Sequence, residues 1–505
     1  MLLLNKILMS FQNIEIMLRD KIKQKLFITN ELFDKMQKDD CTAERVLNFS
    51  RPFEIKTIST LCGLNGIKKK GYGISQLLRV LLIMPFVGTM NVWSLMQSGY
   101  SFLADAQKDA FYRLKNNPAI DWRKILYAFC KRFNALTKSE GNATGNGIKC
   151  LIIDDSSLHK SGIKIENAGK IWDHVLGKSV LGMKFLACTF WDGVSLIPLD
   201  FTLHREKGKN KKMPFGIKKR KLQKQYNKDR EKESPGAKRN KECDISKITA
   251  AIQMIKRAVK HGFVPVYVLC DTWFFCFELL QSVKALKKGS IHLLAMCKMG
   301  KINFEWMGKE YSAGQLLKHL SGTKKRCRKV NSYYIECTVN FQGKVLKLFF
   351  SRFSKRGKWR LLATTDTSLS YIKAIEIYQI RWSIEVMFKE LKQYLQIEKC
   401  QSLDFDAQIA DTTLRLIQYL ILTFKKRFEC YETIGGVFRH SQEMLQEMVL
   451  AERLWLIFLE IVKEIGEILE IDVTELIEKM IWCEKTENLI SQFLLINKPP
   501  GNKAA

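Results

Sequence analysis

A small set of acidic residues in this chain has the types and positions needed to bind metal ions. The segment KCLIIDD is a short apolar run that ends in Asp154 and Asp155, and the segment VPVYVLCD ends in Asp271. Each run predicts a buried strand. Aspartates at the ends of neighbouring central strands point into one crevice at the edge of a sheet, where open α/β sheets place their sites. We therefore expect the two strand ends to lie close together.

A further acid, Glu385, belongs to the segment YQIRWSIEVMFKELKQYL, residues 378–395. This segment has the period of an amphipathic helix, in which successive residues are about 100° apart. The apolar residues fill one arc of that helix: Ile377, Ile380, Ile384, Met387, Phe388, Leu391 and Leu395. The polar residues form a stripe beside that arc: Tyr378, Arg381, Glu385, Lys389 and Lys392. We therefore expect Glu385 to lie among cations at the rim of a buried face.

Two interpretations of this stripe are open. In the first, it is a solvated helix face with i,i+4 pairs such as Glu385–Lys389, each worth about 0.2–0.5 kcal/mol. In the second, Glu385 is a metal ligand whose neighbours Arg381 and Lys392 bind phosphates. The strand-end aspartates favour the second, because three carboxylates form a cage of hard oxygens that suits Mg²⁺ or Mn²⁺. Two such ions about 3.5–4 Å apart would serve phosphoryl transfer by activating the attacking oxygen and stabilising the leaving oxygen.

The elements that must position these acids change in kind along the chain. The first 145 or so residues have helical periodicity and little strand character. After KCLIIDD, the runs MKFLACTFWDG and VSLIPLDFTLH predict, together with it, an antiparallel meander of three strands. The strongly basic segment 205–241 predicts a mobile loop or an extended helix. A β-rich stretch then follows VPVYVLCD, and the Glu385 helix opens a mostly helical remainder.

The charge of the chain favours a polyanionic partner. Lys and Arg number 83 against 51 Asp and Glu, which gives a formal net charge of +32 in 505 residues. Each lysine or arginine placed on a phosphate releases a condensed counterion, so the surplus points to nucleic acid. Membrane-surface proteins share this bias, so charge alone does not separate the two classes.

Neither a membrane span nor a secretory signal is predicted. The most apolar stretch, LLRVLLIMPFVGTMNVWSLM, contains Arg79, Pro85 and Gly88 and falls short of the roughly 18 apolar residues that a span needs. We expect a buried helix and a turn there. The 14 cysteines form no Cys-x-x-Cys pair, which favours reduced thiols in a cytoplasmic protein.

The Glu385 helix also contains a known motif. The motif consists of Tyr378, Arg381, Glu385 and Lys392, which are separated by two, three and six residues in turn. This spacing resembles the Y-R-E-K signature of the bacterial cut-and-paste transposases of the insertion-sequence-four group. Two further segments, IIDDSSLHKSG and VYVLCDTWFF, resemble the two aspartate strands of that family. The segment WRLLATTDTS resembles the stretch that leads out of its β-rich insertion, and FYRLKNNPAIDWR resembles the end of its N-terminal DNA-binding region. The resemblance covers about residues 105–420.

The resemblance implies a DDE transposase with an α/β fold. Its catalytic core would be ribonuclease-H-like (retroviral-integrase-like), with a β-rich insertion and helical N- and C-terminal regions. The expected regions are a helical N-terminal DNA-binding region (residues 1–145), the first part of the core (146–285), a β-rich insertion (286–369), the second part of the core (370–425) and a helical C-terminal region (426–505). The C-terminal helices, including LWLIFLEIVKEIGEILEI, have the apolar pattern of either a dimer interface or simple core.

By the same resemblance, Asp154, Asp271 and Glu385 look like the metal-binding catalytic triad, with Asp155 as the alternative to Asp154. Adjacent strand residues point to opposite faces, so only one of the paired aspartates should enter the site. In this fold family a small hydroxyl residue follows the first aspartate two places on, and an apolar residue four places on. DDSSL meets that pattern for Asp154, which we prefer.

The remaining residues of the motif imply contacts with DNA. Tyr378, Arg381 and Lys392 resemble residues that grip the transposon ends, and Lys389 lies on the same stripe. Trp359 stands where family members carry a tryptophan that stacks on a flipped base, an interaction worth about 1–3 kcal/mol per base. Weaker candidates for contact with the DNA backbone are His159, Lys160 and the segment 205–241.

The implied activity is transposition with Mg²⁺ or Mn²⁺ in a two-metal site. The protein would bind the inverted-repeat ends of its element, hydrolyse them, and join the 3′-hydroxyls to target DNA by transesterification. A homodimer would pair two ends before cleavage in trans, and a hairpin intermediate is expected by analogy. The host would be bacterial and the protein nucleoid-associated. The alternatives are a catalytically silent transposase-derived DNA-binding regulator and a nuclease that cuts without joining.

Overall fold

The computed structural model describes most of the chain and divides it into two compact units. The first comprises Met1–Arg51, Ser75–Phe111 and Gly435–Ala505, and the second comprises Pro52–Ile74 and Tyr112–Ile434. The described residues are 48–67, 71–104, 106–139, 147–208, 210–300, 302–354, 356–429 and 431–469. The N-terminal end of the expected DNA-binding region and the last part of the expected C-terminal region lie outside them.

The described part of the first unit is helical. Its elements are α5 (Ile74–Ile83), η3 (Met84–Val87), α6 (Val92–Gln97), η4 (Ser101–Leu103), α7 (Lys108–Lys115) and α17 (Ile434–Leu469). The apolar stretch considered above is divided among α5, η3 and α6, and Gly88 turns the chain with a φ of 78°. Phe86 is fully buried and packs against Phe49 and Phe438, with ring centroids 4.7 and 5.8 Å away. The expected buried helix and turn are therefore confirmed.

Among the residues that the structure describes, no helix combines the length with the apolar character that a membrane span requires.

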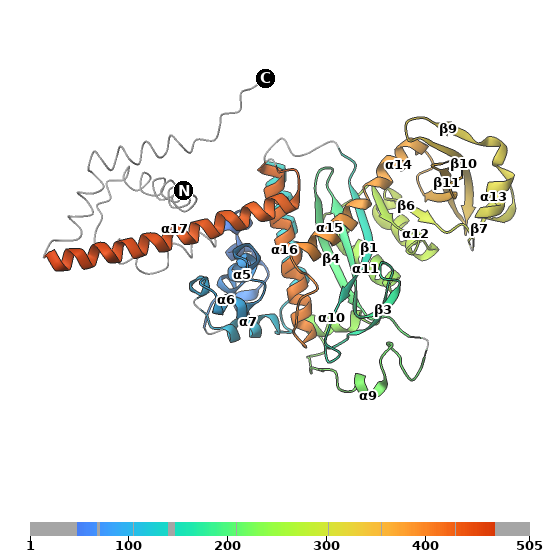
Figure 1. The fold of residues 1–505 in the computed structure, drawn as a ribbon. Coiled ribbons are helices and arrows are strands. Elements are labelled where there is room, and N and C mark those ends of the chain that lie inside the picture. The colour runs from blue at the N-terminus through green and yellow to red at the C-terminus, as the bar shows by residue number, and fades with distance from the viewer. Residues whose placement is uncertain are drawn as a thin grey trace, which may run out of the picture. The chain divides into compact units, whose positions relative to one another are not determined.

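The described residues of the second unit form one twelve-stranded sheet with helices around it (Figure 1). The strands are β1 (Cys150–His159), β2 (Gly169–Asp173), β3 (Lys178–Trp191), β4 (Leu196–His204), β5 (Tyr267–Cys270), β6 (His292–Cys297), β7 (Asn303–Trp306), β8 (Lys309–Ser312), β9 (Lys325–Cys327), β10 (Ser332–Phe341), β11 (Lys344–Arg352) and β12 (Arg360–Thr364). The main strand order is β2-β3-β1-β5-β6-β12-β11-β10-β7-β8, with β4 beside β3 and β9 beside β10. The unit is therefore mixed α/β, as expected.

The part of the sheet that carries the acidic residues combines antiparallel and parallel pairs. β1 pairs antiparallel with β3, and β3 pairs antiparallel with β4, as predicted, but the unpredicted strand β2 lies between β1 and β3 in the chain and also pairs with β3. β5 pairs parallel with β1, and β6 pairs parallel with β5. Because parallel strands are covered on both faces, they read as unbroken apolar runs, and Leu151, Ile152 and Ile153 are all fully buried.

The remaining strands extend the same sheet. β12 pairs antiparallel with β6, and β11 and β10 follow in turn, each antiparallel to its neighbour. The alternation in SYYIECTVNF and KVLKLFFSRF corresponds to β10 and β11. β6 lies within residues 286–369, the range expected for the insertion, yet its parallel partner is β5. The insertion is thus continuous with the sheet that carries the acids.

Helices of the second unit cover both faces of this sheet. They are α4 (Ile55–Leu61), α8 (Trp122–Ser139), α9 (Lys219–Leu222), α10 (Pro235–Glu242), α11 (Lys247–Lys260), α12 (Phe277–Lys284), α13 (Ala313–His319), α14 (Tyr371–Gln379), α15 (Trp382–Gln393) and α16 (Phe405–Phe428). On α15, Phe388 packs against Phe185 of β3 with ring centroids 5.6 Å apart. On α11, Arg257 binds Asp200 of β4, which is level with Cys188 of β3. Cys188 is an odd number of residues from Phe185, so α11 and α15 lie on opposite faces.

A buried ionic cluster joins α8, α10 and α11 to β4. Asp200 is 2% exposed and accepts hydrogen bonds from Arg123 at 2.8 Å and Arg257 at 2.7 Å. Glu242 binds Arg123 at 2.7 Å and Arg239 at 3.0 Å. Burial alone would raise the pKa of Asp200, but the arginines outweigh it and the pKa is lowered. Asp200 is therefore ionised and fully compensated within the fold.

The basic segment 205–241 folds against the sheet instead of forming an extended helix, so that alternative is wrong. It contains the single short helix α9 before α10 begins. Its residues 207–224, here called the basic arm, are followed by Gln225, whose side-chain amide donates hydrogen bonds to the carbonyls of Ile163 and Ala168. The backbone path of the arm is therefore set by contacts with the sheet domain.

Candidate active site

The strand register brings Asp154 and Asp271 side by side. The parallel strands β1 and β5 pair up to Ile153 and Cys270, and the two aspartates are the next residues. β5 ends there because the Asp271 carboxylate accepts a hydrogen bond from the backbone N–H of Trp273 at 3.0 Å and turns the chain. β1 continues along β3 for several more residues. The expectation that both acidic positions end their strands is thus right for Asp271 and wrong for Asp154.

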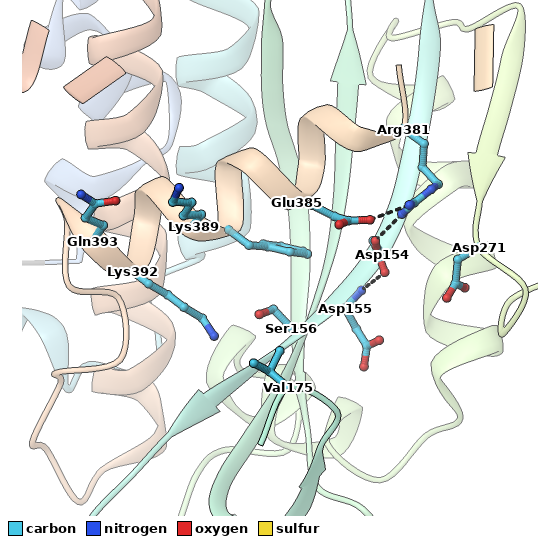
Figure 2. Close-up of a pocket in the computed structure, with 11 residues that line it drawn as sticks. Asp154, Asp155, Ser156, Val175, Asp271, Arg381, Glu385, Lys389, Lys392 and Gln393 are labelled. Atoms are coloured by element: carbon cyan, nitrogen blue, oxygen red, sulfur yellow. Dashed lines mark hydrogen bonds and ion pairs between the residues drawn. The ribbon is translucent and has the colours of Figure 1, made fainter. Parts of the chain in front are cut away.

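Asp154 and Asp155 point to opposite faces of β1, as strand geometry requires. On the α15 side, Asp154 accepts a hydrogen bond from Arg381 at 2.8 Å. On the α11 side, Asp155 pairs with Lys247 at 2.9 Å. Glu385 belongs to α15. In this arrangement Asp154, and not Asp155, shares a face with Glu385 (Figure 2).

The segment around Glu385 forms two helices, so the expectation of one continuous helix over residues 378–395 is wrong. α14 ends at Gln379 and α15 begins at Trp382. Between them, the backbone N–H of Arg381 donates to the carbonyl of Tyr378 at 3.1 Å, which is a tighter i→i−3 turn. The apolar face of α15 is nevertheless buried as expected, through Ile384, Met387, Phe388 and Leu391.

The acids open onto one pocket with a volume of about 720 Å³ (Figure 2). Its lining residues are Asp154, Asp155, Ser156, Val175, Asp271, Arg381, Glu385, Phe388, Lys389, Lys392 and Gln393. They come from β1, the turn after β2, the end of β5, and the segment from Arg381 through α15. The fold therefore gathers the three acids and three of the cations that the sequence singled out, although these are far apart along the chain.

Arg381 binds two of the acids at once. Its Nη1 donates to Asp154 at 2.8 Å, and its Nη2 donates to Glu385 at 2.5 Å. The Arg381 side chain is only 14% exposed. A single guanidinium therefore lies between the β1 acid and the α15 acid.

Asp154 and Asp271 hold their protons more tightly than ordinary aspartates do. Burial is the largest cause that raises the pKa of Asp154, to about 7, and the nearby charge of Asp271 adds to it. Arg381 opposes that shift but does not cancel it. The pKa of Asp271 is also raised, mainly by burial. Two carboxylates held together in this way favour a proton or a cation between them.

The two lysines of the stripe lie in different settings. Lys392 donates from Nζ to the carbonyl of Ser157 at 2.7 Å and pairs with Glu398 at 3.2 Å. Lys389 is exposed at the rim of the pocket. Lys389 is therefore accessible to a bound anion, whereas Lys392 would first have to leave its protein partners.

Tyr378 and Trp359 do not line the pocket. The Tyr378 hydroxyl donates to the carbonyl of Cys270 at 3.3 Å, next to Asp271. Trp359 follows β11, and its ring is covered by the Arg352 guanidinium at 4.8 Å. Tyr378 thus supports the backbone beneath the acids, while Trp359 belongs to the insertion.

His159 and Lys160 are engaged within the protein. His159 pairs through Nε2 with Asp173 at 2.7 Å. Lys160 is 9% exposed and donates to the carbonyl of Glu398 at 3.0 Å. Lys160 is therefore largely buried and bound within the protein, and its contact with DNA stays a prediction.

Sequence reasoning missed the α11 side of the pocket. Lys247 pairs with Asp155 and also lies over the ring of Trp273, 4.0 Å from its centroid. Trp273 is 45% exposed. Its position just after Asp271 was a usable signal, but nothing local singled out Lys247, because its partner Asp155 lies 92 residues away.

Among the described residues, no group of three or more His, Cys, Asp or Glu side chains is arranged to hold a metal ion. The donor chemistry nevertheless suits a hard divalent cation, because the acids of the pocket supply only carboxylate oxygens. The pKa of Asp154 is raised by burial first and by the neighbouring charge of Asp271 second, and a bound cation would offset both effects. The donor set is therefore of the kind that Mg²⁺ or Mn²⁺ prefers, while in this structure Arg381 occupies oxygens of Asp154 and Glu385.

Comparison with known families places the first two acids in context. The sequence model of a family described as DDE superfamily endonuclease matches residues 100–287. The match includes Asp154 and Asp271 and ends before Glu385. No curated protein sequence matches the chain. This similarity supports a nuclease or transposase activity on DNA in general, and endonucleases of this superfamily typically use divalent metal ions.

Proposed function

We propose that this protein is a DDE transposase of the insertion-sequence-four type. It binds the inverted-repeat ends of its element, cleaves them by metal-dependent phosphoryl transfer and joins the 3′-hydroxyl ends to target DNA. The strand order β4-β3-β1-β5-β6, three antiparallel strands followed by two parallel ones, supports a ribonuclease-H-like core for this activity.

One observation carries the proposal. Asp154, Asp271 and Glu385 line a single pocket although they belong to β1, the end of β5 and α15. The matched family segment includes only the first two, so Glu385 is supplied independently by the helix with the Y-R-E-K spacing. A structural role does not require three acids to converge on a solvent-open pocket in which a single arginine is shared between two of them.

The three carboxylates would hold Mg²⁺ or Mn²⁺ as a two-metal site. When bound, the ions would activate the attacking oxygen and neutralise the leaving oxygen. Arg381 and Lys389 are at the pocket to bind the phosphates beside the scissile bond. Lys392 would join them after exchanging its bond to the Ser157 carbonyl. Tyr378 holds the strand end beneath Asp271. Trp359 would stack on a base, after Arg352 leaves its ring.

The proposed function requires two DNA ends and hence a dimer. On α17, the exposed residues Ile461, Ile465 and Ile468 recur at helical spacing on one side, which supports this region as the dimer interface. The N-terminal region, whose described residues are helical, would bind DNA in the same assignment. A bacterial, nucleoid-associated protein would follow from the same assignment.

A second candidate is a catalytically silent DNA-binding regulator. The hydrogen bonds from Arg381 to Asp154 and Glu385 favour this candidate, because the guanidinium occupies carboxylate oxygens that would otherwise bind a metal ion. A nuclease that cuts without joining shares the same acids. These candidates differ from the proposal in their products and not in their pocket.

One assay separates the three candidates. The full chain is incubated with Mg²⁺, a donor duplex that carries the terminal inverted repeats flanking its gene, and a target plasmid. The proposal expects cleavage at the ends followed by joined product. Binding without cleavage identifies the regulator, and cleavage without joining identifies the nuclease.

The Glu385→Ala variant tests the residue assignment. It should lose cleavage by at least about 10³-fold while its affinity for the ends persists. Glu376→Ala is the matched control, because Glu376 is an acid on α14 that pairs with Lys329 and does not line the pocket. Normal cleavage by Glu385→Ala would refute the assignment.

A further inference from the structure

We propose that the basic arm, residues 207–224, binds the DNA duplex backbone beside the active site, independently of sequence. This proposal rests on the proposed function and adds a second DNA-contact surface to it. Between residues 207 and 224 the sequence has no Asp or Glu. The exposed cations of the arm are Lys207, Lys211, Lys212, Lys218, Lys219, Arg220, Lys221 and Lys224. Within the described part of the chain none of them forms an ion pair, although Lys207 lies near enough to Asp244 to act with Arg205 in lowering the pKa of that carboxyl.

The arm is held in place and is therefore more than a solvated run of charge. The backbone N–H of Lys170 on β2 donates to the carbonyl of Phe215 at 2.8 Å. The Arg205 guanidinium lies 3.9 Å from the Phe215 ring centroid. Beyond the arm, the N–H of Tyr226 donates to the carbonyl of Lys164 at 2.8 Å. Fixing the backbone lowers the ordering entropy that binding would otherwise cost.

Strand β2 connects the arm to the active site. The turn from β2 to β3 carries Val175, which is 95% exposed and lines the pocket (Figure 2). Asp173 fixes this turn, because its carboxylate accepts hydrogen bonds from the N–H groups of Val175 and Leu176, each at 2.9 Å. Lys170, which holds the arm, is five positions before Val175. A strand rises about 3.3 Å per residue, and Lys170 is three strand positions before the end of β2 at Asp173, so the arm joins β2 about 10 Å from the turn that lines the pocket.

That separation fits a DNA duplex lying across both sites. At 3.4 Å per base pair, about 10 Å corresponds to about three base pairs. Trp172, 45% exposed, lies on the connecting strand between the turn and the arm. A duplex whose scissile phosphate occupies the pocket would therefore meet the arm within the first half-turn of the helix.

The composition of the arm indicates contact with phosphates and not with bases. All but one of its cations are lysines, which act as point charges, whereas bidentate recognition of guanine is typically done by arginine. Each neutralised phosphate releases a counterion and so adds about 0.9 to the magnitude of the slope of log K against log salt. The arm should thus strengthen binding to any duplex and increase its salt dependence.

The test compares two variants with four charges removed from each. The arm variant is K218Q/K219Q/R220Q/K221Q, and the control is K287Q/K309Q/K318Q/K344Q, whose lysines are exposed elsewhere on the second unit. Fluorescence anisotropy with a random-sequence duplex is measured over a salt series in chelator, so that no catalysis takes part. We expect the arm variant to bind the duplex at least about tenfold more weakly at low salt. The slope of log K against log salt should become smaller in magnitude by between about 1 and 4. The control should change much less.

An unchanged slope, or an equal loss in the control, would overturn the proposal. A second measurement on the unaltered chain does not depend on the folding of a variant. Acetylation of arm lysines, read by mass spectrometry, should be suppressed by duplex DNA and not by polyglutamate. Protection by polyglutamate alone would identify an acidic protein as the partner and overturn the proposal. Failure of the proposed function would appear differently, as ends that stay uncut while the arm still responds to DNA.

Discussion

The two faces of one sheet treat buried aspartates in opposite ways. On the α11 face, Asp200 is bound by Arg123 and Arg257, and its pKa is lowered. On the α15 face, Asp154 shares Arg381 with Glu385, and its pKa is raised to about 7. Both side chains are buried, with residue exposures of 2% and 9%. The difference is therefore in the supply of cations and not in burial.

This contrast separates a carboxylate that serves folding from one available for chemistry. The fold provides the counter-charges of Asp200 itself, so that aspartate gains nothing from an added ion. Around Asp154, the acid Asp271 is a close neighbour and a single arginine is divided between two carboxylates. Strong pKa perturbation by burial and a like charge in an open pocket is typical of functional sites.

The largest expected effect is on folding stability. Asp200→Asn should destabilise the protein by about 3–5 kcal/mol, because it leaves Arg123 and Arg257 buried without their shared partner. The isosteric control Asp154→Asn should leave stability at pH 8 unchanged or increase it. Urea unfolding monitored on the second unit's tryptophans measures both. Equal losses in the two variants would show that both aspartates are structural.

The next effect is on the pH dependence of stability. The folded-state pKa of Asp154 lies above its ordinary value of 3.8, so between about pH 4 and pH 7 the folded state binds more protons than the unfolded state. The contribution of Asp154 to stability therefore falls as the pH rises through that window, by on the order of a few kcal/mol in total. Subtracting the Asp154→Asn profile from the wild-type profile, both in chelator, isolates this contribution. A flat difference between pH 4 and pH 7 would contradict the raised pKa.

The sequence predicts the parts of this contrast that depend on residues close together in the chain, and it misses most of those that depend on residues far apart. The strands β1 and β5 and the buried face of α15 were expected, because apolar runs and helical spacing are local patterns. The convergence of Asp154, Asp271 and Glu385 was expected from the rule that such strand ends meet at one sheet edge and from the family resemblance. The continuation of β1 beyond Asp154 was not, since that strand is extended by pairing with β3. The strand alternation that separates Asp154 from Asp155 was predicted, but the partner of each was not.

The break between α14 and α15 and the Asp200 cluster were also unpredicted. No proline or glycine marks Ile380–Arg381, so the segment reads as one helix from sequence alone. The charged side chains around Asp200 come from α8, α10 and α11. Those that bind it directly, Arg123 and Arg257, are 77 and 57 residues away in the sequence, so no local pattern indicates the contact. The fixed path of the basic arm likewise depends on a backbone hydrogen bond from Lys170 of β2 to Phe215, which composition does not encode.

A smaller effect concerns the cation that Arg381 supplies. Arg381→Ala should tighten Mn²⁺ binding by about tenfold, equivalent to about 1.4 kcal/mol, because it frees Asp154 and Glu385 and removes a positive charge beside them. Electron paramagnetic resonance of free Mn²⁺ measures the dissociation constant directly. Arg352→Ala is the control, since Arg352 lies over Trp359 and outside the pocket. Weaker Mn²⁺ binding in Arg381→Ala would mean that Arg381 positions the acids for the metal and does not compete with it.

The smallest expected effect lies on the α11 side of the pocket, where Asp155 resembles Asp200 more than it resembles Asp154. Its pair with Lys247 is partly exposed, with side chains 18% and 16% accessible, so Lys247→Gln should cost about 0.2–1 kcal/mol of stability. A double-mutant cycle with Asp155→Asn should give a coupling energy in the same range. Asp155→Asn should also retain cleavage that Asp154→Asn loses. The reverse pattern would make Asp155 the metal ligand, and Lys247 would then be the internal cation that the metal displaces.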